Sequence, residues 1–128
     1  MPKKVLQIIN APYRCTIEEQ DDPAIWITHA MRGAGGNFSV LLRGSAVNYA
    51  KRDQDAAGLC IGGKEQTQPP RIDRDVASLM EKGVAVYVVE NDVVERGLER
   101  RELLEGIQFT SRQNVSQLFD THDAIWHW

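Results

Sequence analysis

The segment that most constrains the fold is an apolar run, residues 84–89, that passes directly into a polar turn. Its valines are typical of a buried β-strand, and the Lys82-Gly83 pair before it is typical of a helix end. After the run, Asp92 and Glu95 have the spacing of a capping box, so we expect a helix with Asp92 as its N-cap. A strand that turns straight into a helix is typical of an α/β fold, and ligands or reactive groups gather at such turns.

The remainder of the chain repeats this alternation of strand and helix. Apolar runs predict four more strands, at residues 5–9, 38–42, 107–109 and 124–128. Caps and apolar spacing predict helices at residues 22–33, around 46–50, before Gly83, at 99–105, and after Ser111, which we expect to cap a helix carrying Val115, Leu118 and Phe119. Residues 51–70 read as a loop of about twenty residues. The order predicts an α/β sandwich of three layers, with a mainly parallel sheet of about five strands.

Size and charge restrict the possible functions. The 128 residues, 42% hydrophobic, suffice for one domain, which we take to span residues 1–128. The net charge of -3 gives no electrostatic reason to expect nucleic acid or an anionic membrane as a partner. The apolar run near the N-terminus is too short for a signal peptide or a membrane span, so we expect a cytoplasmic protein.

Neither a cofactor nor a metal is indicated. Residues 58–64 match the first part of a P-loop pattern, but Glu65 stands where a magnesium-binding Ser or Thr belongs, and no strand precedes it. We interpret this stretch as a flexible glycine loop. The histidines, His29, His122 and His127, have no cysteine or carboxylate at ligand spacing.

Two thiols could carry chemistry. Cys15 follows the first strand and should open on the same sheet edge as Asp92. Cys60 lies within the long loop, flanked in sequence by Lys51, Arg52 and Lys64, and nearby cations lower a thiol pKa. A free cysteine is more often an unreactive side chain that only packs against its neighbours. For each thiol, a reactive role and a packing role therefore both stay open.

Several segments, in this order and spacing, resemble the DsrE/DsrF-like family of small sulfur-relay proteins, which includes TusD-like members. They are the opening strand and residues 42–47, 79–84, 88–98 and 103–106. The resemblance implies a flavodoxin-like sandwich that assembles into homo- or hetero-oligomers, typically trimers or hexamers. It also implies a place in sulfur oxidation or tRNA thiolation, with other sulfur-relay proteins as partners.

The chain departs from the family pattern at its chemical centre. Characterised carriers of the family hold a persulfide on a cysteine four residues before an Arg-Gly pair. Here that pair is Arg96-Gly97, so the carrier position holds Asp92, and Val89 stands where some relatives have another cysteine. An aspartate cannot accept sulfane sulfur. The chain is therefore either a non-catalytic, partner-binding member whose edge binds a small anion or another protein, or a sulfurtransferase-like carrier that uses Cys15 or Cys60.

We expect five residues to converge at one edge of the sheet. They are Asn10, Tyr13, Cys15, Asp92 and Arg96. Simpler roles remain open, because Arg96 could pair with a surface carboxylate such as Glu95 or Glu99, and loop residues such as Asn10 and Tyr13 often satisfy backbone groups. The aromatic strand at residues 124–128 is expected to pack on the core or on a neighbouring subunit.

Overall fold

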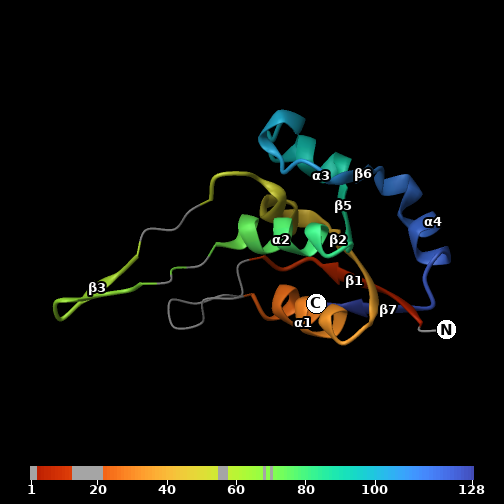
Figure 1. Ribbon diagram of the computed structural model, residues 1–128. Helices are drawn as coiled ribbons and strands as arrows, with labels where there is room; N and C mark the ends of the chain where they lie inside the picture. Colours follow the sequence, from red (N-terminus) through yellow and green to blue (C-terminus); the bar gives the residue numbers. More distant parts are fainter. Residues whose placement is uncertain (1–2, 13–21, 55–57, 68, 70) are drawn as a thin grey trace.

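A computed structural model describes residues 3–12, 22–54, 58–67, 69 and 71–128. Its centre is a five-stranded sheet in the order β6-β5-β2-β1-β7 (Figure 1), in which every neighbouring pair is parallel. The strands are β1 (Lys4–Ile9), β2 (Asn37–Leu42), β5 (Ala85–Val89), β6 (Gln108–Thr110) and β7 (Ala124–His127). The predicted α/β class and parallel sheet are confirmed. The last strand lies outside β1, so the strand order differs from the 2-1-3-4-5 order of flavodoxin itself.

Helices cover both faces of the sheet. On one face, α1 (Pro23–Gly33) and α2 (Ile72–Glu81) enclose the larger core, together with the 3-10 helix η1 (Gly44–Ala50) and α3 (Glu90–Glu95). On the other face, α4 (Val115–Asp120) covers a smaller cluster. The central strands are mostly apolar without alternation because both of their faces are buried, and Gln7 and Ser39 are polar side chains buried within them. No helix in the described part of the chain is long and apolar enough to span a membrane.

Strand β1 shows how the two cores share one sheet. Ile9 packs into the larger cluster, whereas Leu6 and Ile8 pack into the smaller one. Leu118 and Phe119 of α4 pack against that smaller cluster, as does Val115. The predicted apolar face of this last helix is therefore confirmed.

Three local predictions need correction. The predicted loop at residues 51–70 contains a hairpin, formed by β3 (Cys60–Ile61) and β4 (Lys64–Glu65). This hairpin extends away from the rest of the molecule (Figure 1). The predicted helix at 99–105 is one 3-10 turn, η2 (Arg100–Glu102), because Leu103 pairs with Lys51 in an extended bridge. Ser111 precedes the 3-10 turn η3 (Arg112–Asn114), but its side chain makes no cap hydrogen bond, and the Asn114 N–H donates to the Ser111 backbone carbonyl (2.9 Å).

The start of α1 agrees with the sequence prediction. Asp22 is the N-cap, and its Oδ1 accepts from the backbone N–H groups of Ala24 (2.9 Å) and Ile25 (3.2 Å). The buried Tyr49 hydroxyl donates to the other oxygen, Oδ2, at 2.5 Å. One buried carboxylate thus fastens the beginning of α1 to η1.

Replacing Tyr49 by phenylalanine removes that donor and leaves a buried carboxylate oxygen less satisfied. We expect Tyr49→Phe to lower the free energy of unfolding by about 1–3 kcal/mol. Urea denaturation followed by circular dichroism measures the loss. The control is Tyr87→Phe, since the half-buried Tyr87 hydroxyl has no hydrogen-bond partner among the described residues. Equal stability of Tyr49→Phe and the wild type would contradict the assignment.

Candidate functional site

Asp92 lies at the carboxyl edge of the sheet, but it does not cap the helix that follows β5. Helix α3 begins at Glu90 with Val89 as its N-cap, so Asp92 sits within the first turn. The predicted capping box of Asp92 and Glu95 is therefore wrong. The physical reason is that other elements hold the Asp92 side chain.

Both carboxylate oxygens of Asp92 have partners from distant segments. Oδ2 accepts from the backbone N–H of Gly44 at 2.8 Å, and Oδ1 accepts from Arg112 Nη2 at 2.6 Å. Arg112 also donates to Glu95 (3.1 Å). With only 8% of its surface exposed, Asp92 joins the turn after β2, helix α3 and the turn after β6. We call Asp92, Gly44 and Arg112 the aspartate anchor.

The surroundings of Asp92 favour its ionised form. Burial alone would raise the pKa of the carboxyl, but the Gly44 N–H, the Arg112 guanidinium and the charge of Arg96 together lower it. The pKa of Arg112 is raised in turn by its hydrogen bonds to Asp92 and Glu95. An ionised carboxylate with both oxygens engaged is a poor proton acceptor, so this geometry favours an anchoring role over acid-base chemistry.

Arg96 is the second predicted edge residue that the structure places beside Asp92. Its Nη1 donates to the Asp92 backbone carbonyl at 3.2 Å and lies 3.9 Å from both Asp92 Oδ1 and Glu95 Oε2. Its Nη2 donates to the hydroxyl of Ser45 at 3.3 Å. The expected pairing with Glu95 is present, whereas Glu99 pairs with Arg101 (2.5 Å).

A separate polar cluster forms where β1, β2 and β7 end. Arg43 Nε donates to Asn10 Oδ1 at 3.0 Å, and Arg43 Nη2 lies 3.1 Å from His127 Nε2. Asn10 Nδ2 is 3.4 Å from the same ring nitrogen. Asn10 is the predicted edge residue in this cluster, and Arg43 and His127 are partners that were not predicted. Arg43 could have been found, because it directly follows an apolar strand and such positions meet at one edge.

The two cysteines differ in what the structure says of them. Cys15 and Tyr13 lie outside the described residues. Cys60 is an exposed, free thiol on β3, in the hairpin that extends away from α3 (Figure 1). Its partner across the hairpin is Glu65, so a carboxylate residue rather than a cation faces it in the ladder.

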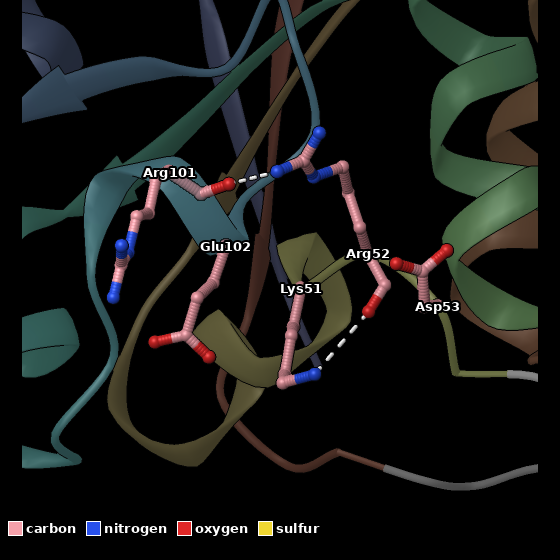
Figure 2. Close-up of a pocket in the computed structure, with 5 residues that line it drawn as sticks. All are labelled: Lys51, Arg52, Asp53, Arg101 and Glu102. Carbon is pink, nitrogen blue, oxygen red and sulfur yellow. Dashed lines mark hydrogen bonds between the residues drawn. The ribbon is translucent and has the colours of Figure 1, made fainter.

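Lys51 and Arg52, two of the three cations expected to activate Cys60, are engaged elsewhere, whereas Lys64 lies on the second strand of the same hairpin. Figure 2 shows Lys51 and Arg52 in a polar cleft of about 360 Å³, which Asp53, Arg101 and Glu102 also line. Lys51 Nζ donates to the Arg52 carbonyl (3.3 Å), and the Arg52 guanidinium donates to the Arg101 carbonyl. Both cations therefore donate hydrogen bonds to backbone carbonyls. The cleft contains none of the predicted site residues. Within the described ranges, no group of three His, Cys, Asp or Glu side chains could hold a metal ion.

The aspartate anchor predicts a pH-dependent stability. Because the pKa of Asp92 is lower in the folded chain than the unfolded value of about 4, the ionised carboxylate stabilises the fold above that pH. This stabilisation is lost as the pH falls through the folded pKa. We expect Asp92→Asn to lower the free energy of unfolding by roughly 1–2 kcal/mol at pH 7, with a smaller difference from the wild type below pH 4.

Urea denaturation at pH 7, 5 and 3 tests this expectation. Glu105→Gln is the matched control, since Glu105 is exposed and makes no ion pair within the described part of the chain. A difference between Asp92→Asn and the wild type that is independent of pH would contradict the lowered pKa.

Comparison with known proteins gives similarity of fold. No protein-family model and no curated protein matches the chain in sequence. Among solved structures, the YchN protein of E. coli is 19% identical with a TM-score of 0.74, and the match covers 100% of both chains. MTH1491 from Methanobacterium thermoautotrophicum is 16% identical with a TM-score of 0.63, covering 98% of this chain and 99% of that one.

A third solved structure extends the same result. BT1422 from Bacteroides thetaiotaomicron is 10% identical with a TM-score of 0.68, covering 98% of this chain and 95% of that one. MTH1491 and BT1422 are both described as proteins of unknown function. At these identities the similarity shows the fold alone: the chain has the α/β fold of YchN, with a five-stranded parallel sheet between helices.

Proposed function

We propose that this chain is a DsrE/DsrF-like protein of cytoplasmic sulfur metabolism that binds partners and does not itself carry sulfur. The fold shared with YchN, a DsrE/DsrF-like protein, supports the resemblance read from the sequence. The single observation that carries the non-catalytic assignment is the aspartate anchor, because it fills the carrier position with a side chain that holds the fold together.

The surroundings of Asp92 would suit a carrier thiol. A thiolate is stabilised by nearby cations and by backbone N–H donors, and Arg112, Arg96 and the Gly44 N–H supply both. In this chain the Asp92 carboxylate supplies the negative charge permanently. The same groups therefore serve to hold three strand ends together instead of activating a nucleophile.

Exposed apolar side chains at the end strand support an oligomer as the working form. Ile125 and Trp126 of β7 are 41% and 37% exposed, and the Trp126 ring packs edge-on against Phe38 at 5.6 Å. Strand β7 is also a sheet edge with backbone groups open to pairing. The proposal includes a homo-oligomer, a trimer or hexamer as the resemblance implies, and other sulfur-relay proteins as partners.

A sulfur-loading experiment tests the non-catalytic assignment. We expect the wild type, incubated with glutathione persulfide and then exchanged into donor-free buffer, to pass no sulfur on to a free thiol acceptor. Intact-mass and peptide-mass spectrometry locate any added sulfur atom. Turnover of a persulfide on Cys15 or Cys60 would overturn the proposal in favour of a carrier that uses that thiol.

A substituted thiol tests the surroundings of the carrier position. We expect alkylation of the thiol in Asp92→Cys by iodoacetamide to fall to half its plateau rate at a lower pH than alkylation of Cys60 in the same chain, because the groups around position 92 favour a thiolate. Rates come from peptide-mass spectrometry, and circular dichroism verifies that the variant is folded. If both thiols of a folded variant reached half their plateau rates at the same pH, the result would contradict this account of the site.

The oligomer is tested by light scattering at micromolar concentration. We expect the wild type to be larger than a monomer and Ile125→Lys to shift it towards the monomer, because a charge on the exposed edge disfavours strand pairing. Ile61→Lys, which adds the same charge to the exposed hairpin, is the control. A monomeric wild type would contradict the oligomer.

A further inference from the structure

Arg43 stands at the carboxyl edge of the sheet without a negatively charged partner among the described residues. Its backbone N–H donates to the Ile9 carbonyl at 3.1 Å, which holds the residue directly beyond the last rungs of β1 and β2. We propose that Arg43 binds the oxyanion group of a small ligand, such as a phosphate, sulfate or carboxylate. The inference rests on the proposed function in one respect, namely that the retained edge is a binding surface.

The partners of Arg43 are neutral groups. The guanidinium donates through Nε to the Asn10 amide oxygen and through Nη2 to His127. The other arginines of this edge have carboxylates close by, with Arg96 at 3.9 Å from Asp92, Arg100 at 2.6 Å from Glu90, and Arg112 at 2.6 Å from Asp92. An arginine binds oxyanions best where no carboxylate already occupies its donors, and Arg43 meets that condition.

The cluster fixes the orientation of the guanidinium in advance. Because the guanidinium and the Asn10 amide nitrogen can only donate, the Nε2 atom of His127 is the acceptor in these contacts. The Asn10 amide is oriented by the same contacts. Nη1 of Arg43 donates to none of the described residues, so it is free to donate to a ligand oxygen. Such preorganisation lowers the entropic cost of binding.

The position in the sheet is one where ligands bind in α/β folds. The chain proceeds from β1 to β2, β5 and β6 in one direction and then returns to place β7 on the other side of β1. Ligands of open parallel sheets bind beyond the carboxyl ends of the strands where the order reverses. Asn10, Arg43 and His127 come from the ends of the three strands that meet at this reversal.

Negative charge near the cluster comes from two carboxylates. At the last residue of the sequence, the Trp128 backbone oxygen accepts from the Asn10 N–H at 3.2 Å, and no ion pair joins this terminus to Arg43 within the described residues. The other is Asp92, whose Oδ2 accepts from Gly44, the residue after Arg43. Two arginines already neutralise it, Arg112 and Arg96. Arg96 also reaches Ser45 at 3.3 Å, which brings a second cation to the same turn.

A titration with simple anions tests the site. Isothermal calorimetry of the full chain with sodium phosphate, sulfate and acetate, at constant ionic strength set by sodium chloride, is expected to show saturable binding of at least one anion. We expect Arg43→Gln to weaken that binding at least about tenfold. Arg101→Gln is the matched control, because Arg101 is exposed and pairs with Glu99, and it should bind as the wild type does. The preferred anion distinguishes a tetrahedral from a planar ligand group.

Absence of binding in the wild type, or equal binding in Arg43→Gln, would overturn the inference. If Arg43→Gln does not fold, nitrogen-15 NMR of the wild type tests the inference instead. The Nε–H signal of Arg43, assigned through its contact with Asn10, must then shift saturably as the anion is added. An unchanged signal overturns the inference. A negative result in the anion titration would leave the aspartate anchor and the non-catalytic assignment unaffected. Conversely, sulfur turnover on a thiol would overturn the non-catalytic assignment and leave the anion-binding result unaffected.

Discussion

The carboxyl edge of this molecule depends on the hydrogen bonds that Asp92 accepts from Gly44 and Arg112. Each comes from a segment that follows a different strand, so one carboxylate closes the ends of β2, β5 and β6 against each other. The loops that follow parallel strands lie at one edge of the sheet, but the hydrogen bonds between the strands do not hold those loops together. The aspartate anchor supplies that connection with charged hydrogen bonds, which are stronger than neutral ones.

The aspartate anchor also explains why one residue at position 92 cannot both hold the fold together and act as a reactive nucleophile. A carrier nucleophile must be accessible and able to form a bond with sulfur. Asp92 is largely buried, ionised and fully engaged, so the donors that could activate a thiol are used for structure. The cation of this edge that remains available to bind a ligand is instead Arg43, whose hydrogen-bond partners are neutral groups.

Two aspartates show what could be predicted from the sequence and what could not. Asp22 precedes a proline and an apolar helical pattern, and its capping bonds run to residues two and three positions away, so local spacing predicted them correctly. Asp92 has equally good capping spacing, yet it bonds to residues 48 and 20 positions away. Local preference was overridden because a guanidinium and a free N–H from other segments compete for the same carboxylate.

The amino-acid sequence by itself determined the five strands of the main sheet and most of the helices between them, the doubly buried central strands and the absence of a thiol at the carrier position. These follow from residue type and short-range periodicity, which are properties of the chain alone. Only the tertiary structure decided that β7 returns to the outer side of β1, that Arg43 meets Asn10 and His127, and that Asp92 is an anchor. Those outcomes depend on contacts between residues far apart along the chain, and local patterns carry no information about such distances.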